Sequence, residues 1–199
     1  MIVGNGESGI ISSGAQTLYP TTERINPVTA HLLWESQLGL ITDVELKYGY
    51  ARFKLPDSSA RGNAVIAVYD KEGKVLWSWH IWITDHPVEQ PVTIGEHTIT
   101  FLDRNLGATA ATCNSAENAL ATYGLYYQWG RKDPMIYSMD YNFSNNEDAY
   151  VYNHLDNFLR WRYEDAEDGA GTMEYAVANP MSFVLGAKSN DYDWIYSSH

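Results

Sequence analysis

The feature that most constrains this chain is a stretch of alternating side chains over residues 74–84. A period of two over this length predicts a β-strand and excludes a helix. Both faces carry large apolar groups, so the strand is expected inside a sheet. One face would carry Val75, Trp77, Trp79, Ile81 and Ile83, and the other Leu76, Ser78, His80, Trp82 and Thr84.

A partner strand precedes it. Ala64–Tyr69 is a short apolar run, and residues 70–73 have turn composition, with Gly73 able to adopt a positive φ. The sequence therefore predicts a long hairpin at 64–84. His80 is expected to be packed or hydrogen-bonded within it. Four tryptophans are expected in the core: Trp34, Trp77, Trp79 and Trp82.

The rest of the first half also reads as strands. Thr29–Glu35, Leu40–Lys47 and Tyr50–Leu55 lack a helical period and lie close together in the sequence. We therefore expect a small β-sandwich over residues 27–88, preceded by a flexible leader at 1–26. The leader contains G-N-G-E-S-G at 4–9, but the dinucleotide fingerprint needs a strand before it and a helix after it, and neither is indicated.

The second half, residues 89–199, is expected to be a separate α+β domain, following a junction at Asp85–Pro91. Gly95 and Glu96 can form a tight turn in a second hairpin. The other expected elements are short and are connected by loops. They are strands at 92–94, 97–102, 125–129 and 181–185, helices at 115–122 and 147–162, and a short element at 172–178.

Charge separates the two halves. The chain carries a formal net charge of −12, and residues 89–199 hold 16 acidic against 6 basic residues. Such a field repels nucleic acid and anionic membranes, so neither is expected as a partner. The apolar runs are too short to span a membrane. The single cysteine, Cys113, excludes an internal disulfide and a CxxC metal site.

Motifs for catalysis are missing from the sequence. There is no HExxH pair and no G-x-S-x-G elbow, so neither zinc chemistry nor a serine nucleophile is indicated. Paired carboxylates could still support glycoside hydrolysis, which stays an alternative. No cofactor is expected. Weak calcium candidates are Asp191 and Asp193, whose oxygens suit that ion without EF-hand spacing.

Aromatic residues mark the region of the chain where a binding site is expected. Twelve of them fall between Tyr123 and Tyr163. Tyrosine and tryptophan rings can stack on sugar rings, while nearby charged groups bind hydroxyls. The candidate ligand-binding residues are Tyr126, Tyr127, Trp129, Arg131 and Asp133.

Four segments carry a resemblance to a known family: 63–87, containing VLWSWHIWITDHP; FLDRNLGA at 101–108; YGLYYQWGRKDP at 123–134; and 172–198, containing NDYDWIYSS. Together they resemble fimbrillin-family surface proteins of gut anaerobic bacteria. The region from residue 97 onward looks like a FISUMP-type domain, which is related to C-type-lectin-like folds. The resemblance implies an Ig-like β-sandwich followed by a lectin-like module, exported to the outer-membrane surface or beyond.

Relatives of this kind are associated with pilus, adhesion or glycan-handling roles. We therefore expect a non-enzymatic adhesion or interaction protein whose partners are other surface or pilus subunits. A carbohydrate-binding module is the first alternative and a glycoside hydrolase or its accessory protein the second. In relatives a further stretch would follow DWIYSS, so the lectin-like region ending at His199 is expected to be incomplete.

Overall fold

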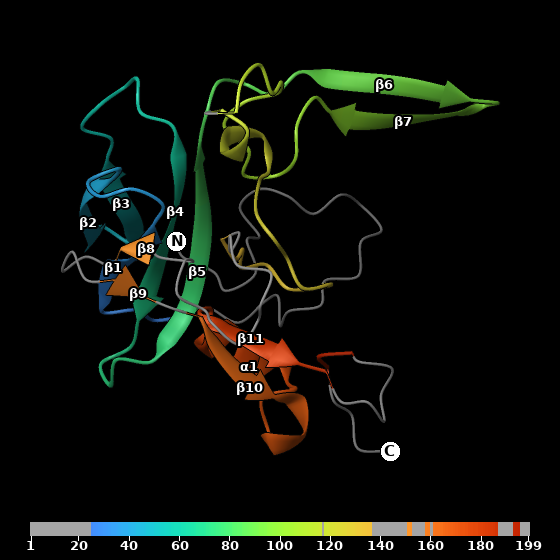
Figure 1. Ribbon diagram of the computed structural model, residues 1–199. Coiled ribbons are helices and arrows are strands. Elements are labelled where there is room, and N and C mark those ends of the chain that lie inside the picture. Colours follow the sequence, from blue (N-terminus) through green and yellow to red (C-terminus); the bar gives the residue numbers. More distant parts are fainter. Residues whose placement is uncertain are drawn as a thin grey trace.

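The computed structural model describes residues 25–116, 118–136, 161–186 and 193–195, together with the backbone of 151–152 and 158–159. Figure 1 shows a mainly β protein built from several small sheets. The largest sheet has the order β5-β4-β1-β8-β9. Its strands are β1 (Thr29–Glu35), β4 (Gly62–Tyr69), β5 (Val75–Ile83), β8 (Val151–Tyr152) and β9 (Phe158–Leu159).

The hairpin predicted from the alternating stretch is confirmed as β4 and β5, which pair antiparallel from Gly62–Ile83 to Tyr69–Val75. Gly73 has a φ of 81°, as its place in the turn requires. The Asp70 carboxylate accepts hydrogen bonds from the backbone N–H groups of Glu72 and Lys74. A single acidic side chain thus fixes the turn that joins the two strands.

The expectation that 74–84 lies inside a sheet is wrong. Among the described residues, β5 forms one end of the five-stranded sheet, with β4 as its only strand neighbour. Its apolar side chains are explained by what covers its two faces instead. The hairpin of β2 (Thr42–Lys47) and β3 (Tyr50–Lys54) covers one, and helix α1 (Met173–Ala178) packs from the other side. Side-chain alternation reports covered faces and carries no information about paired edges.

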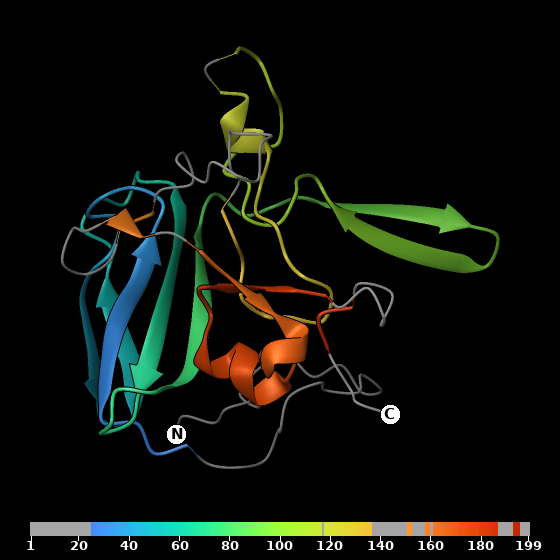
Figure 2. The ribbon, with the colours of Figure 1, turned by 60° about the horizontal axis from the view of Figure 1, so that its bottom comes forward.

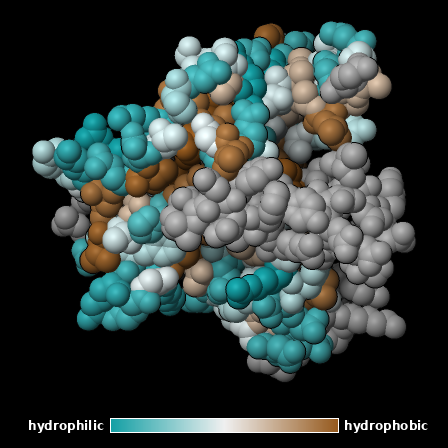
Figure 3. Space-filling view, turned by 60° about the vertical axis from the view of Figure 1, so that its left-hand side comes forward, coloured by the Kyte–Doolittle hydropathy of each residue, from teal (hydrophilic) through white to brown (hydrophobic). Residues whose placement is uncertain are grey.

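The β2–β3 hairpin makes the first half a small sandwich. A buried cluster fills the space between the layers, and Trp79 packs against its edge; the cluster consists of Leu32, Leu40, Ile41, Ala64 and Ile66. Strand β2 begins at Thr42 rather than at Leu40. The buried Glu35 carboxylate accepts hydrogen bonds from the N–H groups of Gly39 and Ile41, which holds the preceding segment in a loop. Figure 3, with the β2–β3 side forward, shows hydrophobic residues between hydrophilic ones.

The opposite face of the main sheet is covered by the second half of the chain, as Figures 1 and 2 both show. Trp34 and Val65 are buried there, with Leu33, Leu125, Ile136, Trp161 and Met181 packed around them. Residues 27–88 and 89–199 therefore share one apolar cluster, and β8 of the second segment pairs with β1 of the first. Burial of this kind is worth roughly 25 cal/mol per Å² of apolar surface.

The four predicted core tryptophans differ in burial. Trp34 and Trp77 are buried, and Trp79 is half-buried against two clusters of the sandwich. Trp82 is half-buried on the other face of β5, where its indole N–H donates to the backbone carbonyl of Ala108 at 3.0 Å. Trp82 thus connects the sheet to the loop that follows the second hairpin.

The second half contains two short parallel strands, β10 (Arg162–Asp165) and β11 (Ser182–Leu185). The 3-10 turn η2 (Ala166–Asp168) and helix α1 connect them. Thr172 caps α1 by accepting a hydrogen bond from the N–H of Tyr175 at 3.1 Å. The short element predicted at 172–178 is therefore a helix, and the strand predicted at 181–185 is confirmed.

Three other predictions for this half are wrong. The helix expected at 115–122 is reduced to the 3-10 turn η1 (Leu120–Thr122). Among the described residues, the strand expected at 125–129 makes only one isolated bridge, Tyr126 with Met135, and the backbone then turns, with the N–H of Arg131 donating to the Gln128 carbonyl at 2.9 Å. The helix expected at 147–162 is excluded wherever that range is described, since β8, β9 and the start of β10 fall within it. Among the described residues no helix is long and apolar enough to cross a membrane.

Candidate functional site

Among the elements whose burial the structure describes, the most exposed is a second hairpin, β6 (Glu89–Ile94) and β7 (His97–Leu102). Figures 1 and 2 show it projecting away from the rest of the chain. Every residue of both strands is exposed. The turn predicted at Gly95 and Glu96 is confirmed, with a φ of 62° at Gly95. Strand β6 starts earlier than expected, so Pro91 lies within it rather than in a junction.

The two faces of this hairpin differ in polarity. Cross-strand register places Ile94 opposite His97, Val92 opposite Ile99 and Gln90 opposite Phe101 on one face. That face therefore presents four large apolar side chains to solvent. The other face is polar at its centre, where the hydroxyls of Thr93 and Thr98 hydrogen-bond at 3.1 Å. An exposed apolar face of this kind marks an interaction site more often than chance would give.

The two edges of the hairpin also differ. The N–H of Asp103 donates to the carbonyl of Val88 at 2.9 Å, which continues the ladder past the strand ends. Inward and outward backbone groups alternate along an antiparallel pair. On β7, the outward N–H and C=O groups are therefore those of Thr98, Thr100 and Leu102. On the outer edge of β6 the central residue is Pro91, which has no N–H to offer.

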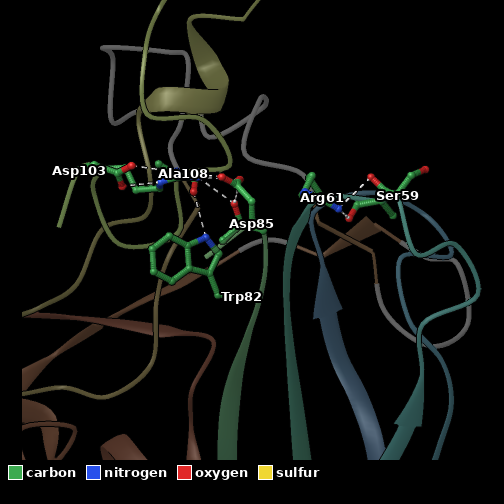
Figure 4. Close-up of polar contacts among 9 residues, drawn as sticks. Ser59, Arg61, Trp82, Asp85, Asp103 and Ala108 are labelled. Carbon is green, nitrogen blue, oxygen red and sulfur yellow. Dashed lines mark hydrogen bonds and ion pairs between the residues drawn. The ribbon is translucent and has the colours of Figure 1, made fainter. Parts of the chain in front are cut away.

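An ionic clamp holds the base of the hairpin to the end of β5. The Arg104 side chain is only 4% exposed and bonds Asp103 at 2.8 Å and Asp85 at 3.0 Å. Its guanidinium, helped by the Thr84 hydroxyl, lowers the pKa of Asp85 to about 2, and it also lowers the pKa of Asp103. Figure 4 shows Asp85, Asp103 and Ala108 gathered above Trp82 at this end of the sheet. The clamp fixes the direction in which the hairpin leaves the body.

A groove of about 580 Å³ lies beside β7 where the hairpin meets the body. It is lined by Thr100, Phe101, Leu102, Asp103, Arg104, Asn105, Leu106, Ala111 and Thr122. Its far wall is held by backbone contacts. The N–H of Leu125 donates to the Leu106 carbonyl at 2.8 Å, and Gly124, with a φ of 77°, lets the two segments approach closely.

A chain of buried hydrogen bonds joins the groove to the main sheet. The side-chain amide of Asn63 donates to the Gly107 carbonyl at 2.9 Å, so its oxygen faces His80. His80 therefore donates from Nε2 to Asn63 at 2.9 Å and accepts at Nδ1 from the Tyr127 hydroxyl at 3.1 Å. Burial lowers the pKa of His80 to about 4, with Asp133 opposing the shift, and burial also raises the pKa of Tyr127 to about 12.

The five residues predicted to bind a ligand are divided between the surface and the interior. Tyr126 is 60% and Trp129 is 90% exposed. Tyr127 is half-buried and its hydroxyl hydrogen-bonds to His80, while Arg131 and Asp133 are buried. Of these five residues, Tyr126 and Trp129 are the exposed ones. A binding role for the set stays a prediction.

Asp133 belongs to an internal polar cluster. It accepts from the Ser78 hydroxyl at 2.6 Å and from the Lys132 ammonium at 2.6 Å, and Lys132 also contacts Ser78 and lies 4.7 Å from the centroid of the Trp77 ring. Burial lowers the pKa of Lys132, while Asp133 opposes the shift. Serine beside lysine could support nucleophilic chemistry. Here Ser78 is only 2% exposed, so this cluster is best read as a polar connection between β5 and the second half.

Arg131 makes a similar connection on the C-terminal side. It bonds the Gln128 side chain at 2.7 Å and the Ser182 carbonyl at 2.5 Å, and it also bonds the Asn179 carbonyl. It therefore joins the loop after Trp129 to the segment around β11. A guanidinium held by several carbonyl and amide oxygens positions backbone rather than offering itself to a ligand.

The calcium candidates are only partly described. Asp193 is exposed and its carboxylate accepts a hydrogen bond from the N–H of Ile195, while Asp191 lies outside the described residues. Within the part of the chain that the structure covers, no three potential metal-ligating side chains come together.

The sequence predicted that the β6–β7 segment forms a hairpin, but it did not predict a binding site there. The signal was present in the sequence, since apolar residues alternate with polar ones over 92–101, directly after Pro91. No family model, curated protein or solved structure matches this chain. The fimbrillin and lectin-like resemblance therefore stays a prediction.

Proposed function

We propose that this chain is a non-enzymatic interaction protein of the cell surface, which joins another protein subunit through the β6–β7 hairpin. The observation that supports the proposal is the projecting hairpin, which has an apolar face of Val92, Ile94, Ile99 and Phe101 and an edge on β7 that no other described strand pairs with. A strand edge and an apolar face left in solvent favour pairing with another chain.

The construction of the hairpin's base supports the same function. A two-stranded hairpin is marginally stable in water by itself, because it cannot bury either face. Here the Arg104 clamp and the continued ladder at Val88 and Asp103 hold it away from the body. An element kept extended in this way is prepared for a partner before the partner arrives, which lowers the entropic cost of binding.

The finer description of the fold belongs to this proposal. The packing of β2 and β3 over the β1-β4-β5 sheet supports an Ig-like sandwich. The loop-rich second half, with its parallel β10–β11 pair around α1, supports comparison with a lectin-like module. Export to the cell exterior, as a surface or pilus subunit, completes the proposal.

Site-specific photo-crosslinking in the source cells tests this function. A benzoylphenylalanine residue would replace Phe101 on the apolar face, and in the control it would replace Tyr48, which is 84% exposed in the turn between β2 and β3. We expect a crosslink to another protein chain from position 101 and none from position 48. Fractionation of the same cells should place the chain at the surface. Equal crosslinking from both positions, or a cytoplasmic chain, would contradict the proposal.

A second candidate function is glycan binding, favoured by the exposed rings of Trp129 and Tyr126. Flat aromatic faces in solvent are suited to stacking on sugar rings. A glycan array run with the chain and with Trp129→Ala would test it, in the presence and absence of calcium. Binding that disappears in Trp129→Ala supports a glycan site, and an array without hits counts against it.

A further inference from the structure

The open edge of β7 can be assigned an occupant. Resting on the proposed function, we propose that this occupant is a second copy of the same chain, which pairs antiparallel with β7 about a two-fold axis at Thr100. In this arrangement Thr100 lies opposite its own counterpart. Thr98 lies opposite Leu102 of the second copy, and the reverse pair follows by symmetry.

The alternation of inward and outward backbone groups along β7 permits this register. The three residues that point outward on β7 are Thr98, Thr100 and Leu102, and the two-fold axis brings outward residues opposite outward residues. Three such pairs exchange about six N–H···O bonds. Self-pairing of β6 in the same way would place the missing N–H of Pro91 at the centre of the edge. The chemistry of the two edges therefore selects β7.

Side-chain complementarity favours a second copy over an unrelated strand. The register that pairs Thr100 with itself brings Ile99 opposite Phe101 of the other chain, on the apolar face. It joins the two exposed apolar faces into one four-stranded sheet. Cross-strand pairs of β-branched and aromatic residues of this kind stabilise sheets by about 0.2–1 kcal/mol each.

The groove beside β7 receives the tip of the second hairpin. Counting outward from Thr100, Glu96 in the turn of one copy reaches the level of Arg104 in the other, and Ile94, which pairs with His97 on the returning strand, reaches the level of Asp103. Both Asp103 and Arg104 line the groove. The turn of one copy therefore reaches the groove of the other.

Whole-molecule charge sets the conditions under which the dimer forms. Each chain carries a net charge of −12, although residues 89–102 contain only Glu89 and Glu96 as acidic residues and no Lys or Arg. Repulsion between the two bodies is reduced at about 0.15 M salt, where the Debye length is roughly 8 Å. Mass measurements should therefore be made at that ionic strength.

The decisive comparison is between two proline variants, measured by sedimentation with the full chain. We expect the parent chain to sediment at twice its 22.5 kDa mass. Thr100→Pro removes an outward N–H from β7 and should shift the mass to that of one chain. Thr93→Pro removes an outward N–H from β6 and should leave the dimer intact. Matched thermal unfolding of the two variants will show that neither change acts through misfolding.

Cysteine crosslinking provides a second measurement, in a Cys113→Ser background. Paired residues of this type have Cα atoms about 5.5 Å apart, within the range of a disulfide. Thr100→Cys should therefore form a dimer on mild oxidation at low protein concentration, whereas Thr93→Cys, on the same face but the opposite edge, should not.

Three results would overturn the inference: a parent chain that stays monomeric, equal dimerisation of the two proline variants, or equal crosslinking of the two cysteine variants. A monomer that still crosslinks to a different protein through position 101 would overturn only the second copy as partner. It would leave the proposed function in place.

Discussion

Pro91 and Thr100 lie directly opposite each other in the β6–β7 ladder, and this pair gives the hairpin one closed edge and one open edge. Both residues direct their backbone away from the partner strand. Proline has no N–H for a neighbouring strand, whereas Thr100 offers both an N–H and a C=O. A chain that assembles through one edge needs the other edge protected from pairing, and a proline is a common means of protection.

The buried His80 predicts a loss of stability in mild acid. The unfolded chain protonates this imidazole near pH 6.5 and the folded chain only near pH 4. The unfolded state therefore binds more protons between these values, and stability falls as the pH falls through them. From pH 7 to pH 5 the loss due to His80 amounts to about 2 kcal/mol. Urea unfolding at both pH values measures it.

His80→Gln provides the control for this pH effect, because glutamine can hydrogen-bond without titrating in this range. The variant should be less stable at pH 7 and should lose less stability than the parent chain on acidification. An unchanged difference between pH 7 and pH 5 would mean that other groups produce the pH dependence and that His80 is not buried as a neutral imidazole.

Gly124 is predicted to tolerate no side chain. A Cβ there would lie 2.6 Å from the Leu106 carbonyl oxygen, and its φ is 77°. Gly124→Ala should therefore cost more than Gly73→Ala, whose φ of 81° imposes similar backbone strain without any atom within 4 Å of the added carbon. We expect roughly 1 kcal/mol for Gly73→Ala and clearly more for Gly124→Ala. Equal unfolding free energies for the two variants would contradict close packing behind the groove.

The buried Asp133 predicts a large effect for a small change. Asp133→Asn leaves the Lys132 ammonium buried without its carboxylate, so the variant should lose about 3 kcal/mol of stability. Adding Lys132→Met should restore part of that loss, because the unpaired charge is then gone. A double variant that is destabilised by the full sum of the two single changes would show that the pair is not coupled.

The Arg104 clamp predicts a local effect. Arg104→Met should increase hydrogen exchange at the β6 and β7 amides and should return the pKa of Asp85 from about 2 toward 3.8. Because the depressed pKa is a property of the folded state, the clamp stabilises above pH 3.8 and loses its effect as the pH falls through 2. Arg52→Met, in an exposed pair with Glu45, should leave hairpin exchange unchanged.

The strands of this fold could be predicted wherever the side-chain pattern was long. β1, β3, β5 and β7 fall close to their expected ranges because their side chains alternate with a period of two, and β4 does so because it is a short continuous apolar run. The pattern could not show that β5 ends the sheet, since alternation reports covered faces only. Nor could it show that helical spacing in 147–162 was coincidental, in a segment rich in residues that favour strands.

The candidate site was less predictable for a related reason. Residue type alone suggested Arg131 and Asp133 as ligand groups, and the structure places both in internal networks formed with Ser182 and Ser78, which are distant in sequence. The sequence does not distinguish a charged residue that faces solvent from one that is paired with another polar residue inside the protein. Which N–H and C=O groups point outward from the hairpin depends instead on the strand register. That register is established by the hydrogen bond between the N–H of Asp103 and the carbonyl of Val88.

The most direct test of the open edge is amide hydrogen exchange of β7 by NMR, first in dilute monomer and then in the assembled state. The amides of Thr98, Thr100 and Leu102 should exchange rapidly in the monomer and slowly after assembly. The inward amides of Ile99 and Phe101 should be the better protected ones in the monomer. Protection of the Thr100 amide in the monomer, or rapid exchange at that amide in the assembly, would contradict the central claim that the outer edge of β7 is the surface through which this chain binds its partner.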